Sequence, residues 1–297
     1  MKQNDKMHRD EILSDENLVQ HLLEEQFPKW TNLPIRRVPS SGTENALYRL
    51  GDEMIVRLPR RPGATKPIDK EQKWLPKLAP LFPIAIPIPL GKGKPTKEFP
   101  YPWSIYKWLK GENPIVDHLN DPSSLAKDVA KFINILHQIN LKDGPLARRG
   151  APLEVQDDQM RVALKESHGL VDTDAVIDIW EKALKVPKYS GKPVWIHGDL
   201  SPGNILLVNG KLSAILDFGG LGVGDPAVDS IAAWNLLSAE TRETFRRELQ
   251  YDKETWARGR GWALSIALIQ LPYYKDTNKE LASNARHVIN EILEEDR

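Results

Sequence analysis

The sequence predicts an α+β fold of two lobes, in which a small antiparallel sheet with one helix precedes a mostly helical lobe. Short apolar runs separated by turn residues fill the first part of the chain, whereas amphipathic helical patterns fill the second part and are interrupted by one patch of strands. A turn-rich stretch, Lys-Gly-Glu-Asn-Pro at 110–114, separates the strand-like part of the sequence from the helical part. The chain of 297 residues is long enough for both lobes, and we assign 1–109 to the first and 110–297 to the second.

The first lobe is expected to contain a hairpin, a helix and a further strand. Residues 45–50 and 53–58 are apolar runs on either side of Gly51-Asp52, a pattern typical of two strands joined by a tight turn. Residues 67–78 have a helical pattern, and the prolines at 76 and 80 are expected to stop the helix. The aromatic run 101–109 is typical of a strand.

The second lobe is predicted from helical periodicity. Within 123–139, for example, apolar residues recur every three or four positions and so share one face of a helix. Helices are expected over 123–139, 172–186, 227–237, 241–250, 255–271 and 278–294. Short strands are expected between the second and third of these helices, and Asn209-Gly210 between two apolar runs indicates a hairpin there.

Composition excludes several classes of protein. Forty-one basic residues balance forty-one acidic ones, so the chain lacks the basic excess that is typical of nucleic-acid-binding proteins. There is no cysteine, which excludes disulfides, thiolate catalysis and cysteine zinc sites. The polar start of the chain is unlike a secretory signal, and no apolar run is long enough to span a membrane. We therefore expect a cytoplasmic protein that binds neither nucleic acid nor membranes.

One motif points to a specific chemistry. The octapeptide His197–Asn204 is followed by Asp217-Phe218-Gly219, thirteen residues after its last member, which is the spacing of the catalytic and metal-binding loops of kinases. Asp199 is the expected base, because an ionised carboxylate can position an attacking hydroxyl and accept its proton. Asn204 and Asp217 are the expected magnesium ligands, because Mg²⁺ prefers hard oxygen donors.

The expected hairpin gives a reason for the two metal ligands to meet. Asn204 stands at the start of its first strand and Asp217 at the end of its second, so antiparallel pairing brings both residues to the same end. A purely structural hairpin is the alternative interpretation, and it explains less of the motif's spacing. Asp225 before Pro226 is typical of a helix N-cap, and Asp229, one turn further on, is placed to accept backbone N–H groups of the catalytic loop.

The segment 194–234 resembles the aminoglycoside and macrolide phosphotransferases, which are small-molecule kinases with a protein-kinase-like fold. The resemblance extends to the hairpin at 45–61 and to the helix that contains Glu71. It implies a bilobal fold whose first lobe binds the nucleotide, with the adenine next to Tyr106 and Trp108. It also implies transfer of the γ-phosphate of ATP or GTP to a hydroxyl of a small molecule, with Mg²⁺ as the cofactor.

Two features depart from the family's pattern. Arg57 stands where the family has a lysine that holds the α- and β-phosphates, and arginine can bind phosphate through two N–H groups and pair with Glu71. The glycine-rich loop is reduced to a single glycine, so Ser41 and Gly42 are the residues expected to cap the phosphates. Within the catalytic loop, His197 is expected to pack and hydrogen-bond, and the resemblance implies that Asp229 supports the loop.

The sequence leaves the acceptor open. An aminoglycoside or macrolide acceptor follows from the resemblance alone, and a metabolic kinase of the choline, homoserine or sugar type shares the fold. A catalytically inactive nucleotide-binding protein is the alternative of another class, with Arg57 as its support in the sequence. The choice between ATP and GTP and the oligomeric state also stay open. The arginine pairs 148–149 and 246–247 are interpreted as solvent-exposed.

Overall fold

The computed structural model describes residues 11–40 and 42–296. These described residues form two compact units, of which the first lies within 1–111 together with 214–219, and the second within 112–213 together with 220–297. This division differs from the expected one after residue 109 mainly in the short segment 214–219, which folds with the first unit. Among the described residues, no helix has both the length and the apolar character needed to cross a bilayer.

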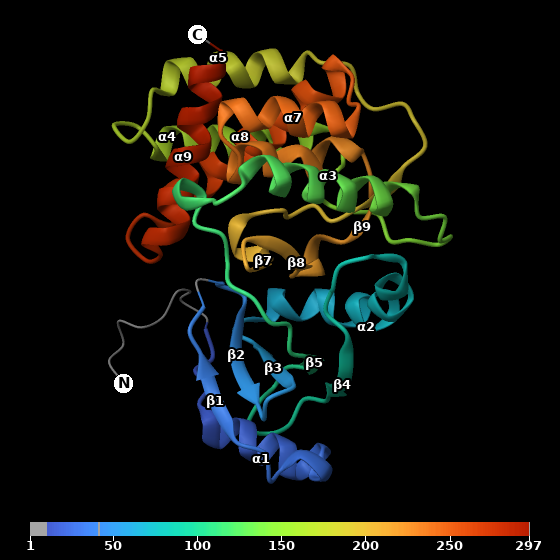
Figure 1. The fold of residues 1–297 in the computed structure, drawn as a ribbon. Coiled ribbons are helices and arrows are strands. Elements are labelled where there is room, and N and C mark those ends of the chain that lie inside the picture. The colour runs from blue at the N-terminus through green and yellow to red at the C-terminus, as the bar shows by residue number, and fades with distance from the viewer. Residues whose placement is uncertain (1–10, 41, 297) are drawn as a thin grey trace. The chain divides into compact units, whose positions relative to one another are not determined.

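The first unit contains a five-stranded antiparallel sheet (Figure 1). Its strands are β1 (Ile35–Val38), β2 (Asn45–Leu50), β3 (Met54–Pro59), β4 (Pro89–Gly93) and β5 (Trp103–Lys107), in the spatial order β1-β2-β3-β5-β4. The expected hairpin is β2–β3, in which Leu50 pairs with Met54. Gly51 in its turn has a φ of 57°, a conformation that glycine adopts without steric cost.

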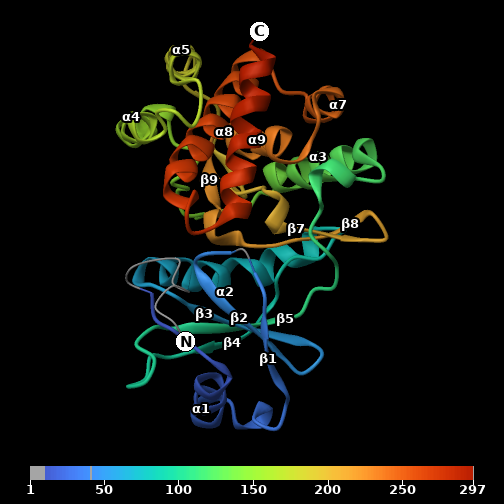
Figure 2. The same ribbon diagram turned by 90° about the vertical axis from the view of Figure 1, so that its left-hand side faces the viewer.

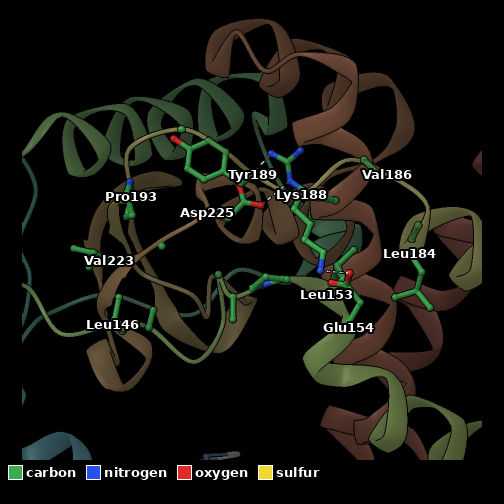
Figure 3. Close-up of a pocket in the computed structure, with 18 residues that line it drawn as sticks. Leu146, Leu153, Glu154, Leu184, Val186, Lys188, Tyr189, Pro193, Val223 and Asp225 are labelled. Atoms are coloured by element: carbon green, nitrogen blue, oxygen red, sulfur yellow. Dashed lines mark hydrogen bonds and ion pairs between the residues drawn. The ribbon is translucent and has the colours of Figure 1, made fainter.

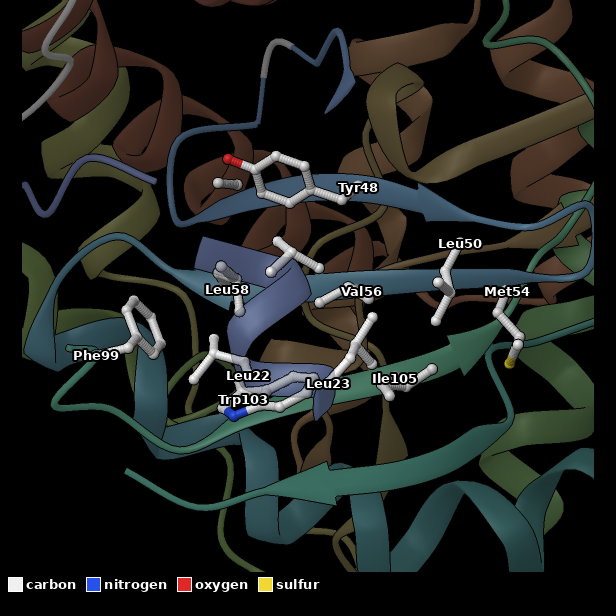
Figure 4. Packing of buried hydrophobic residues seen from close by; sticks show 12 residues of the cluster. Leu22, Leu23, Tyr48, Leu50, Met54, Val56, Leu58, Phe99, Trp103 and Ile105 are labelled. Carbon is white, nitrogen blue, oxygen red and sulfur yellow. The ribbon is translucent and has the colours of Figure 1, made fainter. Parts of the chain in front are cut away.

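The side chains along each strand point alternately to the two sides of the sheet, so its two faces have different neighbours. Val56 of β3 is fully buried in an apolar cluster that also contains residues of helix α1 (Glu16–Gln26), as Figure 4 shows. Its neighbour Arg57 contacts helix α2 (Lys66–Leu78), because successive side chains of a strand point to opposite faces. Figure 2 shows α1 and α2 on opposite sides of the sheet.

The prediction of a single helix in this unit is wrong, because α1 precedes the sheet. The helix is mostly polar, and its buried residues are Val19, Leu22 and Leu23. Its N-cap is Asp15, whose carboxylate accepts the N–H of Leu18 at 2.9 Å. Such a short apolar stripe stabilises a helix only when the sheet supplies a surface on which it can pack, so the local pattern was too weak to reveal it.

Helix α2 ends at Leu78, where the predicted range 67–78 ends, and it includes Pro76 in its last turn. Trp74, Leu75 and Leu78 are all buried. A proline in the last turn removes a single backbone hydrogen bond, and the burial of these large side chains outweighs that loss.

The second unit is mostly helical. Its helices are α3 (Pro122–Gln138), α4 (Asp157–Glu166), α5 (Thr173–Leu184), α6 (Ala232–Leu236), α7 (Ala239–Leu249), α8 (Lys253–Tyr274) and α9 (Lys279–Glu295). The strand pair β6 (Val194–Ile196) with β9 (Gly222–Gly224) accompanies them. A second pair is β7 (Ile205–Val208) with β8 (Lys211–Ile215), of which residues 214 and 215 are assigned to the first unit. Asn209 and Gly210 join β7 to β8 with φ values of 52° and 76°, and a type I′ turn requires positive φ at both positions.

Two parts of this unit differ from the expectation. The expected helix 227–237 is a 3₁₀ helix, Pro226–Ile231, followed by the short α6. Here Gly259 of α8 packs so closely that a β-carbon would lie 2.6 Å from the Ala227 carbonyl oxygen, so tertiary packing constrains this segment. Helix α4 was not predicted, because its sequence is largely polar and its buried residues are Met160 and Ala163.

The N-cap of α8 allows a test of helix capping. The Asp252 carboxylate accepts the N–H of Thr255 at 2.6 Å, and the bonds from the Thr255 backbone and side chain lower the pKa of Asp252 below its usual value. Asp252→Ala is expected to lower the free energy of unfolding by about 1 kcal/mol at neutral pH.

The pH dependence of this effect follows from the depressed pKa. The contribution of Asp252 is fully present above about pH 4, the ordinary pKa of the carboxyl, and is lost as the pH falls through the lower folded-state pKa. Urea denaturation of the wild type and Asp252→Ala at neutral and acidic pH measures the difference. A difference that does not shrink in acid would contradict the capping role.

Candidate active site

The first part of the motif, His197–Asn204, lies in the second unit, directly after β6. The carboxylate of Asp229 is fully buried and accepts the N–H of Gly198 at 2.7 Å and the N–H of His197 at 3.1 Å. Its Oδ2 also lies 3.0 Å from Nε2 of His137, in the last turn of α3. One buried acid thus ties the start of the motif to helix α3 through charge-assisted hydrogen bonds.

His197 and Gly198 determine the shape of the loop. Gly198 has a φ of 76°, in the region that favours glycine. The His197 ring is buried, and its Nδ1 accepts the N–H of Asp199 at 3.2 Å, which requires an unprotonated Nδ1. The ring also makes an edge contact with Phe132 of α3, with ring centres 6.4 Å apart. The structure therefore places His197 inside the loop, beside the expected base.

Both carboxylate oxygens of Asp199 have partners. Oδ1 pairs with the guanidinium of Arg149, and Oδ2 lies 3.3 Å from Nδ2 of Asn204. The same amide nitrogen donates to the backbone oxygen of Asp199 at 2.8 Å. The Asp199 side chain is 35% exposed, so the carboxylate is held in place and can still be reached by a ligand.

Arg149 contradicts the expectation that the pair 148–149 is solvent-exposed. Arg148 is exposed, but Arg149 donates to the Gly198 oxygen at 2.9 Å in addition to pairing with Asp199. Backbone hydrogen bonds between the preceding residues and β9 hold the segment that carries it. Arg149 lies fifty residues before Asp199 in an irregular segment, so no sequence spacing indicated the contact.

The first unit carries the other part of the motif, Asp217-Phe218-Gly219. Asp217 has a φ of 53°, which is uncommon for a residue other than glycine, and its Oδ1 accepts the N–H of Gly219 at 3.1 Å. Nη2 of Arg57 lies 3.7 Å from the same oxygen, and Nζ of Lys70 donates to the Gly219 carbonyl at 2.7 Å. Two cations therefore contact this short loop.

Arg57 also pairs with Glu71 of α2. One guanidinium nitrogen lies 3.3 Å from each carboxylate oxygen, and the Tyr106 hydroxyl donates to the same carboxylate. Burial opposes the charged guanidinium, but Glu71 and Asp217 together raise the pKa of Arg57 above its usual value. Burial and the nearby Glu71 raise the pKa of Tyr106, so at neutral pH Arg57 is charged and Tyr106 is a neutral donor.

The remaining residues that the sequence places at the nucleotide are Ser41, Gly42, Tyr106 and Trp108. Ser41 lies outside the described residues, and the N–H of Gly42 donates to the Ser40 hydroxyl at 3.0 Å. Tyr106 is buried and bonded to Glu71, so its side chain has a partner within the protein. The guanidinium carbon of Arg49 lies over the ring of Trp108, 3.9 Å from the centre of that ring.

The expected magnesium ligands have the chemistry that a hard cation requires. Asp217 offers a carboxylate on a side chain that is 40% exposed. Asn204 uses its amide nitrogen on Asp199, which leaves its amide oxygen as the donor for a metal ion. Within the part of the chain that the structure describes, no group of three or more His, Asp or Glu side chains could hold a metal ion.

Replacement of Arg57 tests its pairing with Glu71. Arg57→Ala leaves the Glu71 carboxylate buried with the Tyr106 hydroxyl as its remaining partner, and we expect the free energy of unfolding to fall by about 2 kcal/mol. Adding Glu71→Gln removes the unpaired charge and is expected to restore part of this loss. Thermal denaturation of the two single variants and the double variant measures the coupling, and purely additive effects would contradict it.

Comparison with known proteins identifies related chains. Two aminoglycoside 3'-phosphotransferases of Escherichia coli match this chain, one at 35% identity over 72 residues and the other at 29% over 126 residues. The matches cover 24% and 38% of this chain. They span only 25% and 44% of the relatives' own lengths.

Solved structures match over nearly the whole chain. The GDP complex of aminoglycoside 2'-phosphotransferase-IIIa has a TM-score of 0.76 at 17% identity, with 96% of this chain and 100% of that chain covered. A macrolide 2'-phosphotransferase from Brachybacterium faecium has a TM-score of 0.64 at 19% identity, with 92% and 97% covered. These likenesses confirm the predicted kinase-like α+β fold class.

A sequence model of a protein family also matches this chain. The model described as the phosphotransferase enzyme family matches residues 35–262, which include both the β2–β3 hairpin and the catalytic motif. The resemblance expected from the motif is thereby confirmed, and this chain belongs to the phosphotransferase enzyme family.

Proposed function

We propose that this protein transfers the γ-phosphate of ATP or GTP to a hydroxyl group of a small molecule, with Mg²⁺ as the cofactor. The observation that carries the proposal is the Asp199 carboxylate, which Arg149 and Asn204 hold on a loop anchored by the buried Asp229. Phosphoryl transfer requires mainly positioning and charge stabilisation, and a fixed, reachable carboxylate supplies the positioning of the attacking group.

Asp199 acts on the acceptor in this proposal. The acceptor oxygen forms a bond to the γ-phosphorus, and the bond from that phosphorus to the oxygen bridging to the β-phosphate breaks. The hydroxyl proton passes to the Asp199 carboxylate, and the nucleoside diphosphate leaves with the bridging oxygen. Because the acceptor must approach Asp199, the 35% exposure of this side chain supports the role.

Asn204 and Asp217 are the proposed ligands of the metal ion, through the amide oxygen of the first and the carboxylate of the second. When bound, Mg²⁺ supplies charge that offsets the negative charge of the phosphates during transfer. Each residue is held by its own neighbours, Asn204 by its bond to Asp199 and Asp217 by its bond to the Gly219 N–H. Both side chains are thus oriented before a ligand arrives.

Arg57 is the proposed phosphate-binding cation of the first unit. Its pairing with Glu71 resembles the lysine–glutamate pair by which protein kinases hold the α- and β-phosphates. The backbone around Gly42 is the proposed cap over the phosphates, and the adenine or guanine is expected near Trp108. The acceptors of the related proteins, aminoglycosides and macrolides, make an antibiotic the first acceptor class to examine.

A nucleotide-consumption assay tests the proposal. Purified protein, Mg²⁺ and either ATP or GTP are incubated with a panel of aminoglycosides, macrolides and metabolite alcohols, and both nucleoside diphosphate and phosphorylated acceptor are measured. We expect acceptor-dependent turnover that chelation of the metal by EDTA abolishes. Nucleotide binding without turnover on every acceptor would favour the catalytically inactive alternative.

A further inference from the structure

Helix α2 holds the short loop that contains Asp217. Nζ of Lys70 donates a hydrogen bond to the Gly219 carbonyl oxygen at 2.7 Å. Pro67, one turn earlier on the same face of α2, lies next to the same glycine, where an added β-carbon would be 3.6 Å from Cγ of the proline ring. These residues all belong to the first unit. The first turns of α2 therefore contact this loop at two points.

The backbone of the loop requires such support. Asp217 has a φ of 53°, a conformation that is disfavoured in a residue with a β-carbon and persists only where neighbouring contacts hold it. Its carboxylate accepts the N–H of Gly219 at 3.1 Å, and the carbonyl oxygen of Gly219 accepts the Lys70 ammonium. Both bonds are made by the backbone of Gly219, so the position of the Asp217 carboxylate is linked to Lys70 through that one residue.

The next residue of the helix attaches α2 to the sheet. Glu71 is buried, lies 3.3 Å from a guanidinium nitrogen of Arg57 on β3, and accepts the Tyr106 hydroxyl. Lys70 and Glu71 point in different directions, because successive residues of a helix are about 100° apart around its axis. One turn of α2 is thus fixed to the sheet by Glu71 and to the loop by Lys70.

Arg57 is less suited than Lys70 to hold the loop. Its Nη2 lies 3.7 Å from Oδ1 of Asp217, longer than a normal hydrogen bond, and the same guanidinium is paired with Glu71. Lys70, in contrast, bonds to a backbone oxygen at 2.7 Å. Lys70 therefore supports the loop without occupying a carboxylate oxygen that a metal ion would use.

We propose that Lys70 is a positioning residue, which holds the loop 217–219 in the conformation from which the Asp217 carboxylate binds Mg²⁺. The inference rests on the proposed role of Asp217 as a metal ligand, and it adds to that role a residue outside the catalytic motif. Lys70 acts through the Gly219 carbonyl and not on the nucleotide. Removal of its ammonium group should therefore weaken the contribution of Mg²⁺ to nucleotide binding and leave metal-free binding nearly unchanged.

Nucleotide binding with and without the metal ion tests this proposal. Calorimetry measures the dissociation constant of a non-hydrolysable analogue of ATP or GTP, once with Mg²⁺ and once with EDTA. Lys70→Met keeps the apolar length of the side chain and removes the ammonium group. We expect Mg²⁺ to tighten binding about tenfold less in Lys70→Met than in the wild type, the factor that one hydrogen bond from a charged donor supplies. The constants in EDTA should agree within about threefold. An equally large loss of affinity in EDTA would indicate direct contact with the nucleotide and would overturn the proposal.

Three further variants serve as controls. Lys70→Arg keeps a cationic donor and is expected to retain most of the wild-type effect of Mg²⁺. Lys73→Met removes the same charge from an exposed position one turn further along α2. Lys188→Met removes a lysine that lies 2.8 Å from Glu154 in the wall of a cavity of about 310 Å³ in the second unit, as Figure 3 shows. The last two variants should respond to Mg²⁺ like the wild type, and equal effects of Lys70→Met and Lys73→Met would contradict a specific role of Lys70.

Amide hydrogen exchange tests the loop itself, without metal, nucleotide or turnover. The Gly219 N–H is bonded to Asp217, so its exchange in the nucleotide-free protein reports how often the loop opens. Mass spectrometry with fragmentation to single residues is expected to show exchange at Gly219 about tenfold faster in Lys70→Met, and unchanged in Lys73→Met. Exchange at the wild-type rate in Lys70→Met would show that the loop keeps its conformation without Lys70, and the inference would fail.

The two measurements separate this inference from the function on which it rests. If exchange and the effect of Mg²⁺ both change as expected but no acceptor is phosphorylated, the phosphotransfer function fails while the role of Lys70 stands. If acceptors are phosphorylated and Lys70→Met has the exchange rate and Mg²⁺ response of the wild type, the function stands and the role of Lys70 fails. A wild type whose nucleotide binding does not respond to Mg²⁺ would overturn both the proposed metal site and this inference.

Discussion

Asp199→Asn is expected to lower kcat by about two to four orders of magnitude, the range that a positioned general base contributes. The substitution removes the charge that accepts the hydroxyl proton and keeps the size of the side chain. Because Asp199 is 35% exposed and its loop is anchored by Asp229, the variant is expected to fold like the wild type. Steady-state kinetics at saturating nucleotide measure the change, and circular dichroism checks the fold.

A control variant separates loss of the base from loss of a surface charge. Asp174 is an exposed aspartate at the start of α5 in the same unit, and Asp174→Ala should retain kcat within about a factor of two. The KM for nucleotide should be similar in Asp199→Asn and the wild type, since the residue is assigned to the acceptor. Turnover of Asp199→Asn at the wild-type rate would remove Asp199 from the mechanism.

Asp229→Ala is expected to lower the free energy of unfolding by about 3–5 kcal/mol. The carboxylate is fully buried and accepts the N–H groups of His197 and Gly198, and no alanine atom can replace that acceptor. Each buried N–H left without a partner costs about 1–3 kcal/mol. Urea denaturation monitored by tryptophan fluorescence measures the loss, and turnover should fall as well because the loop that carries Asp199 loses its anchor.

The contacts of Asp229 can be separated by two further variants. Asp229→Asn keeps one acceptor oxygen and is expected to lose less stability than Asp229→Ala. His137→Ala removes the histidine contact and keeps the two backbone bonds, so a loss of about 1 kcal/mol is expected. An Asp229→Ala variant within 0.5 kcal/mol of the wild type would show that solvent or another group satisfies the N–H groups.

Local patterns in the sequence predicted the elements that depend on nearby residues. The β2–β3 hairpin follows from apolar runs around Gly51, and the β7–β8 turn follows from Asn209-Gly210, whose positive φ values few other residue pairs accept. Strongly amphipathic helices such as α3 were predicted within a few residues of their ends. The motif from His197 to Gly219 was likewise visible, because its spacing along the chain is itself the signal.

By itself, then, the sequence determined the fold class, the family and the candidate base Asp199, since each depends on periodicity or spacing over a few residues or turns. Tertiary structure alone brought Arg149 to that base and His137 to Asp229, the acid that anchors its loop. Arg149 and His137 lie fifty or more residues from the groups they contact, and only the packing of α3 and β9 against the catalytic loop brings them there. Helix α1 also depends on tertiary packing, because its few apolar residues stabilise a helix only where the sheet buries them.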